Sequence, residues 1–297
     1  MLNLQLPSPL QEIKDSLLEE KEIRLFIKRE DLIHPVVSGN KWRKLKYNLI
    51  CARDEGHTTL LSFGGAYSNH LHALAATAKA SGLKSIGVVR GEEISALNPT
   101  LSDAKSNEME LYFISREEYK KKTEEKFVHS LHEKFGDFYL IPEGGYNKEG
   151  MKGCGEIIKE ISIDFDVVCT ACGTGTTIAG LVSTLSEGKK AIGFPVLKGG
   201  DFLYEEINSL LSPFSRTKNK NWHLESNYHF GGYAKWNQEL LDFITTFKQK
   251  QGIALDPVYT GKMMYGLFDL IGKDFFQKGV TIIALHTGGL QGVRALE

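Results

Sequence analysis

The sequence predicts an α/β protein built from mostly parallel sheets flanked by helices. Short apolar runs alternate along the chain with longer segments of helical periodicity. Polar, glycine-rich stretches follow several of the apolar runs, namely GGAYSNH, PEGG, ACGTGTT and HTGG. Repeated strand, turn and helix units imply parallel strands with helices on both faces of the sheet. Ligands bind at the carboxyl ends of such strands, which is where these four stretches are expected to lie.

In the first half of the chain, residues 22–29 (EIRLFIKR) alternate and are rich in branched and aromatic side chains, as is typical of a strand. Ser68-Asn69 and Asn98-Pro99 are helix-start signals before periodic segments. Further strands are expected at 58–63, 84–89, 110–114 and 138–141, and helices at 41–54, 70–82, 98–107 and 116–134.

The alternation continues in the second half. Strands are expected at 165–169, 190–195, 222–225 and 280–286. Helices are expected at 148–160, 178–188, 202–211, 239–250 and 265–276. We find no internal repeat and no low-complexity segment in the sequence.

Composition describes an ordinary globular protein of 297 residues, 41% of them hydrophobic and 25% charged. The net charge of -1 gives no electrostatic argument for binding nucleic acid or an anionic membrane. The first residues lack a signal-peptide pattern, and no apolar run has membrane-spanning length, so a cytoplasmic protein is expected. Cys169 and Cys172 form a C-x-x-C without the second pair of a zinc site; both are expected to be small buried residues.

The stretch 38–47 (SGNKWRKLKY) places cations at the start of a predicted helix. Lys41 and Lys44 share one helix face, close to an N-terminus whose dipole favours anions. A phosphate bound there would satisfy both the dipole and Lys44. Lys41 could then hold a carbonyl cofactor as a Schiff base. The alternative is a basic, solvated surface helix.

The loop 172–177 (CGTGTT) lies between a predicted strand and a predicted helix. Its backbone N–H groups and hydroxyls would form an anion cradle at the helix N-terminus. Ile178 occupies the third glycine position of the dinucleotide fingerprint, and the loop lacks the lysine of a Walker motif. The loop therefore suits a single phosphate better than the nucleotide of a kinase or dehydrogenase. The alternative is a glycine-rich turn with a threonine cap.

Three further positions carry polar groups toward the same expected cleft. Ser68 and Asn69 would cap a helix, which is also their simplest explanation. Tyr259, in DPVYTGK, could act as a general acid/base or nucleophile, or pack in the core. Thr287, in HTGG, could hydrogen-bond a ring nitrogen. His70 and His72 are two residues apart and would diverge on a helix, so no metal site is expected.

Together these motifs resemble the pyridoxal-phosphate enzymes of the tryptophan synthase β-like fold. More narrowly, they resemble the 1-aminocyclopropane-1-carboxylate (ACC) deaminase and D-cysteine desulfhydrase family. The matching motifs keep their order over most of the chain: KREDL, SGNKWRKL, GGAYSNH, PEGG, GTGTTIAGL, DPVYTGK and HTGG. The resemblance implies a homodimer whose subunits have two α/β domains with the cofactor between them. The expected large, cofactor-binding domain is 1–43 plus 152–297, and the small domain is 44–151.

Carried over by position, the resemblance makes Lys41 the Schiff-base lysine and Asn69 the partner of the cofactor's ring hydroxyl. It implies that Ser68 and Tyr259 transfer protons or attack near the substrate. His70 and Tyr233 are expected on the substrate side as well. The implied phosphate contacts are Lys44, Gly173, Thr174, Gly175, Thr176 and Thr177.

Two positions bear on the substrate. The ring-opening deaminases have glutamate after the tyrosine of DPVY and leucine in the final His-x-Gly-Gly, whereas this chain has Thr260 and Thr287, as the desulfhydrases do. A hydroxyl at the pyridine nitrogen would leave the ring less electrophilic than an acid would, which suits loss of a thiolate. The resemblance thus favours β-elimination of D-cysteine to pyruvate, ammonia and hydrogen sulfide. The alternatives are ACC deaminase and a non-catalytic protein that binds a phosphorylated metabolite.

Overall fold

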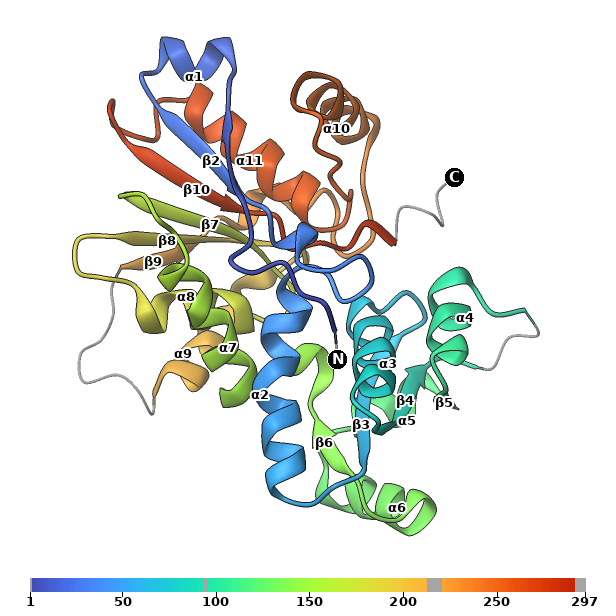
Figure 1. The fold of residues 1–297 in the computed structure, drawn as a ribbon. Coiled ribbons are helices and arrows are strands. Elements are labelled where there is room, and N and C mark those ends of the chain that lie inside the picture. Colours follow the sequence, from blue (N-terminus) through green and yellow to red (C-terminus); the bar gives the residue numbers. More distant parts are fainter. Residues whose placement is uncertain (1, 93–95, 213–220, 292–297) are drawn as a thin grey trace.

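The chain folds around two separate sheets, as the computed structural model shows for residues 2–92, 96–212 and 221–291 (Figure 1). The larger sheet has the order β1-β2-β10-β7-β8-β9 and the smaller one β5-β4-β3-β6. The larger sheet consists of β1 (Leu10–Ile13), β2 (Arg24–Lys28), β7 (Val167–Cys172), β8 (Lys190–Pro195), β9 (Trp222–Leu224) and β10 (Thr281–Leu285). The smaller sheet consists of β3 (Thr59–Gly65), β4 (Lys84–Arg90), β5 (Met109–Ile114) and β6 (Tyr139–Ile141). All pairings are parallel except that of β1 with β2.

Helices cover both faces of each sheet. Those associated with the smaller sheet are α2 (Asn40–Asp54), α3 (Asn69–Ala80), α4 (Pro99–Ser106), α5 (Arg116–Lys120) and α6 (Glu125–Phe135). The remaining ones are α1 (Ser16–Glu20), α7 (Lys148–Lys159), α8 (Thr176–Thr184), α9 (Leu203–Leu211), α10 (Gln238–Gln251) and α11 (Thr260–Gly272). Figure 1 shows α2 between α7 and α3, so this one helix contacts elements of both halves of the molecule.

The period of two in the buried strands explains the layered core. In β2, Leu25 and Ile27 pack in the cluster that includes side chains of α11, whereas Phe26 packs in the opposite cluster with side chains of α8. In β7, Cys169 and Cys172 are three residues apart and therefore belong to opposite clusters. Both thiols are buried and free, as the sequence predicted. Their divergence explains why this C-x-x-C forms neither a disulfide nor half of a metal site.

The α/β class and the mostly parallel sheets are confirmed, but two expected helices were wrong in extent and two elements were not anticipated. The single helix expected over 116–134 is two helices, α5 and α6, separated by a turn. The helix expected over 265–276 begins at Thr260 and ends at Gly272. Its earlier start is explained by the Asp256 carboxylate, which accepts hydrogen bonds from the backbone N–H groups of residues 258–260. The antiparallel strand β1 and the short helix α1 were not anticipated.

The two-domain division stays a prediction. The smaller sheet comes entirely from residues 59–141, inside the expected small domain, and the larger sheet from residues before and after it. The expected boundaries at 43/44 and 151/152 fall inside α2 and α7, which pack closely against each other. A Cβ added to Gly153 would lie 1.8 Å from the Arg43 carbonyl oxygen, so the two backbones are in contact there. Among the described helices, none is both long and apolar enough to cross a bilayer.

Candidate active site

The start of α2 is held against the end of β10. Gly39 precedes the helix with φ 65° and ψ -153°, a conformation that glycine adopts readily. A Cβ at this position would lie 1.9 Å from the Thr287 carbonyl oxygen, so only glycine allows this approach. The contact fixes the first turn of α2, which carries Lys41 and Lys44, beside the HTGG stretch.

The Lys41 amine is connected to the loop after β7 through one side chain. Lys41 Nζ donates to Asn40 Oδ1 at 2.6 Å, and Asn40 Nδ2 donates to Thr177 Oγ1 at 2.8 Å. Asn40 is buried, so little water competes for these bonds. The Lys41 amine therefore lies near the first turn of α8, to which Thr177 belongs.

Burial first, and then the neighbouring Lys44 charge, lower the pKa of Lys41 to about 7. A substantial share of the Lys41 amine is consequently neutral near physiological pH in the ligand-free protein. A neutral amine is the form that attacks carbonyls and accepts protons. The position therefore has the chemistry expected of a nucleophilic lysine.

Lys44 faces the glycine-rich stretches after β6 and β7. Its Nζ donates to the Gly144 carbonyl oxygen at 3.0 Å, and burial lowers its pKa. A Cβ added to Gly144 would lie 2.9 Å from Thr174 Cγ2, which brings the PEGG turn against the CGTGTT loop. A buried cation between two such turns is well placed for an anion, because burial weakens its solvation and strengthens its charge interactions.

The CGTGTT loop forms the turn into α8. Gly175 has the left-handed conformation (φ 77°) and precedes the helix, which begins at Thr176. The Thr174 and Thr176 hydroxyls are 3.0 Å apart and hydrogen-bonded. The first N–H groups of a helix have no partner within the helix, so this turn offers donors to an anion together with the positive end of the helix dipole.

Residues 68–70 begin α3 on the opposite side. Ser68 is the N-cap, and its Oγ accepts from the Leu71 N–H at 3.2 Å. Asn69 accepts a hydrogen bond from the Gln291 side chain, and a Cβ added to Gly289 would lie 2.9 Å from Asn69 Nδ2. The GGAYSNH and HTGG stretches are therefore in contact.

The His70 ring is buried beside the two lysines. Its Nε2 lies 3.0 Å from Ser62 Oγ, while Nδ1 has no hydrogen-bond partner among the described residues. Burial first, and then the Lys41 and Lys44 charges, lower the pKa of His70 to about 3. The ring is therefore neutral at physiological pH and can accept or donate a hydrogen bond without adding a third positive charge.

Tyr259 closes the site from the start of α11. A Cβ added to Gly173 would lie 3.3 Å from Tyr259 Cε1, so the ring packs against the CGTGTT loop. The Tyr233 ring meets it edge to face, with 6.1 Å between centroids. Burial, and then the neighbouring Tyr233, raise the pKa of Tyr259 well above its ordinary value. The Tyr259 hydroxyl therefore stays protonated near neutral pH.

The two threonines of interest differ in how their hydroxyls are used. Thr260 is fully buried, and its Oγ1 donates to Asp256 Oδ1 at 2.6 Å. Thr287 is 7% exposed, and within the described part of the chain its hydroxyl makes no hydrogen bond. Thr287 is thus the one of the pair whose hydroxyl remains available to a ligand.

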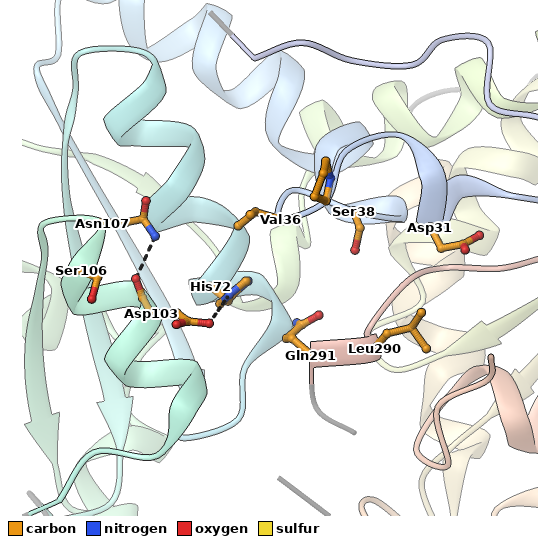
Figure 2. Close-up of a pocket in the computed structure, with 10 residues that line it drawn as sticks. Asp31, Val36, Ser38, His72, Asp103, Ser106, Asn107, Leu290 and Gln291 are labelled. Carbon is orange, nitrogen blue, oxygen red and sulfur yellow. Dashed lines mark hydrogen bonds and ion pairs between the residues drawn. The ribbon is translucent and has the colours of Figure 1, made fainter. Parts of the chain in front are cut away.

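A cavity of about 320 Å³ lies beside this site rather than within it. Figure 2 shows its lining, in which Ser38 and Gln291 border the site and His72 pairs with Asp103 at 3.3 Å. No cluster of His, Cys, Asp or Glu side chains in the described ranges has the composition of a metal site. His70 and His72 indeed point to different partners, Ser62 and Asp103.

Sequence reasoning missed three residues of this site. Asn40 was given no role within the stretch 38–47, although it bridges Lys41 and Thr177. Gly144 supplies the acceptor for Lys44 through its carbonyl, which no side-chain pattern reports. Asp256 holds the Tyr259 backbone N–H at 2.8 Å. The Asp-Pro pair before a helical segment was the available signal for Asp256.

Comparison with known proteins identifies relatives over nearly the whole chain. The family model described as "Pyridoxal-phosphate dependent enzyme" matches residues 2–288. A protein of Pyrococcus horikoshii, provisionally named an ACC deaminase, is 33% identical over 278 residues, 90% of this chain and 85% of that protein. A mitochondrial protein of Arabidopsis thaliana, named bifunctional D-cysteine desulfhydrase/ACC deaminase, is 34% identical over 292 residues, 91% of this chain and 73% of that protein. The crystal structure of an ACC deaminase homologue superposes with a TM-score of 0.81 at 31% identity, covering 99% of this chain and 94% of the other.

Proposed function

Because this chain belongs to the pyridoxal-phosphate dependent enzymes, and within them to the ACC deaminase/D-cysteine desulfhydrase type, we propose that it catalyses β-elimination on D-cysteine. The reaction consumes D-cysteine and water and yields pyruvate, ammonia and hydrogen sulfide. The proposal covers the choice of substrate and the role of each residue. It rests on the donor set around Lys41 and on the two threonines at positions 260 and 287.

The residues present fit pyridoxal phosphate. Lys41 Nζ is the amine for its carbonyl carbon, and Lys44 with the N-terminus of α8 would hold the phosphate. The glycines leave room for a ligand at both ends of the site, since side chains at Gly173 and Gly289 would press on Tyr259 and Asn69. Asn69 would hold the ring hydroxyl and Thr287 the ring nitrogen.

Bound pyridoxal phosphate supplies an electron sink that stabilises the carbanion left when an amino acid loses its α-proton. Lys41 Nζ would take that proton, a task for which its lowered pKa suits it. Ser68 and Asn69 bind the substrate carboxylate, and neutral His70 supports them. The Tyr259 hydroxyl, which stays protonated, donates its proton to the departing sulfur and is oriented by Tyr233.

The observation that carries the choice of substrate is the state of the two threonines. The Thr260 hydroxyl donates its hydrogen bond to Asp256, which leaves the Thr287 hydroxyl as the neutral partner for a pyridine nitrogen. A neutral partner keeps the ring less electrophilic than an acidic one would. Loss of a thiolate, which is a good leaving group, needs less electron withdrawal than opening a cyclopropane ring.

Assays on purified, cofactor-loaded protein test the proposal. We expect hydrogen sulfide and pyruvate from D-cysteine, and little or no ammonia from ACC. Lys41→Ala should lose both the yellow absorbance of the bound cofactor and the turnover. Turnover of ACC alone would instead identify an ACC deaminase, the second candidate, which the names of the relatives favour.

A yellow, borohydride-sensitive protein without turnover of any amino acid would favour a non-catalytic role. Failure to bind pyridoxal phosphate at all would favour a protein that binds another phosphorylated metabolite. A homodimer and a cytoplasmic location stay predictions, which gel filtration with light scattering and cell fractionation would test.

A further inference from the structure

Lys262 is a buried lysine for which the mechanism above has no use. It lies in the first turn of α11 and is 1% exposed. A cation is unfavourable at a helix N-terminus, and burial lowers the pKa of Lys262 to about 8. Burying the charged Lys262 ammonium costs free energy, so it requires a compensating interaction.

The compensation comes from the backbone of one loop. Lys262 Nζ donates to the His229 carbonyl oxygen at 2.8 Å and to the Gly232 carbonyl oxygen at 2.7 Å. These two hydrogen bonds hold the loop between β9 and α10 against helix α11. The Phe230 ring adds an edge-to-face contact with Tyr265 of the same helix, at 5.0 Å between centroids.

The loop needs such ties because its backbone is unusual. Four of the five residues 230–234 have positive φ: Phe230 (51°), Gly231 (90°), Gly232 (120°) and Ala234 (52°). Positive φ is costly for Phe230 and Ala234, which have side chains. The fifth residue, Tyr233, is 44% exposed and extends over Tyr259.

Helix α11 therefore fixes both members of the tyrosine pair. Tyr259 is its N-cap residue, and Lys262, one turn further along the helix, holds the loop that carries Tyr233. We propose that Lys262 is a positioning residue, whose two hydrogen bonds keep the Tyr233 ring against Tyr259 on the substrate side of the site. This inference rests on the proposed function only in assigning the two tyrosines to the substrate side.

Hydrogen exchange tests the structural half of the inference without any substrate. Lys262→Met removes both hydrogen bonds while keeping an unbranched side chain, and we expect backbone amides at 229–235 to exchange at least about tenfold faster. Lys273→Met, at the end of the same helix, is the control, because Lys273 is exposed and its partner within the described ranges is Asp269. Unchanged exchange at 229–235 in Lys262→Met would overturn the inference.

A double-mutant cycle tests the functional half. With D-cysteine and ACC as probes, Lys262→Met should lower kcat/KM about 10- to 100-fold, as expected when a contact residue moves by about 1 Å. In a Tyr233→Ala background, Lys262→Met should have almost no further effect on kcat/KM, because the ring that Lys262 positions is already absent. Two effects that multiply would show that Lys262 does not act through Tyr233.

A second variant covers loss of folding. If Lys262→Met does not yield folded, yellow protein, Lys262→Gln keeps one donor group and should give an intermediate rate of exchange in the loop. Exchange in Lys262→Gln equal to that of the wild type would count against the inference. If wild-type protein turned over neither amino acid, the proposed function would fail, while the exchange comparison would still decide whether Lys262 holds the loop.

Discussion

The first turn of α2 separates its cations by direction. Lys41 and Lys44 face the glycine-rich loops, whereas Arg43 points the opposite way. The fully buried Arg43 guanidinium donates to Glu30 at 2.8 and 3.0 Å and to Glu160 at 2.6 and 2.7 Å. This anchor orients the turn that carries the two lysines. A solvated basic helix, the alternative reading of this stretch, does not describe it.

The lowered pKa of Lys41 predicts a pH-dependent reactivity. In cofactor-free protein, acylation of Lys41 should rise with pH and level off above about pH 7, because the neutral amine is the reactive form. Lys44→Met should shift this midpoint upward, since it removes a neighbouring like charge. Peptide mass spectrometry measures the labelling, with exposed Lys148 as internal reference. A midpoint near the ordinary lysine value of about 10.4 would refute this account of the site.

Arg43→Met should destabilise the protein by about 3–5 kcal/mol, because it leaves the buried Glu30 and the half-buried Glu160 without the guanidinium that pairs with both. Arg53→Met on the same helix should change stability by less than about 0.5 kcal/mol, because Arg53 is exposed and its one hydrogen bond to a described residue goes to the Ser81 carbonyl. Urea unfolding of both variants measures the difference. Equal stability of the two would mean that the buried ion pairs contribute little to holding this turn.

At the scale of elements, three helices meet through glycines. Gly153 of α7 touches the α2 backbone, and a Cβ added to Gly180 of α8 would lie 2.5 Å from Met151 O in α7. Glycines at these crossings let the helix axes approach more closely than larger side chains allow. The close α2–α7–α8 packing is what brings Lys41 next to the start of α8.

Gly153→Ala should therefore destabilise the protein by about 1–3 kcal/mol through overpacking and weaken cofactor binding, because α2 would shift away from α8. Gly272→Ala is the matched change in a helix, with open space around the added Cβ, and should be neutral or stabilising by up to about 1 kcal/mol. Denaturant midpoints and cofactor titrations measure both effects. Unchanged stability and cofactor affinity in Gly153→Ala would mean that α2 and α7 can move apart without loss of free energy.

Most elements were predictable because period and capping signals agree with the fold. The expectations failed where tertiary contacts decide. Residues 116–134 contain no glycine or proline, yet the helix breaks, with Tyr119 buried in the core in contact with the Arg90 and Lys122 cations. Strand β1 has a weak pattern of its own and depends on pairing with β2.

At the scale of the whole molecule, four loops from two sheets converge on one place. Contacts of Gly144 with Thr174, Gly145 with His70 and Gly289 with Asn69 link the turns after β3, β6, β7 and β10, and Lys44 of α2 donates to Gly144. Their convergence was predictable from the rule for the carboxyl ends of parallel strands. Backbone acceptors such as Gly144, the bridge through Asn40 and the loop tied by Lys262 were not, because each depends on packing between distant segments.

The most direct test of the central claim, that Lys41 Nζ faces the cradle at Gly173–Thr177, is to map the cofactor after borohydride reduction. Protein loaded with pyridoxal phosphate is reduced, digested and analysed by mass spectrometry. We predict that the yellow absorbance is bleached and that the added mass is found on the peptide containing Lys41, and is absent from Lys41→Ala. Attachment at Lys44 or Lys262, or no attachment at all, would contradict the account.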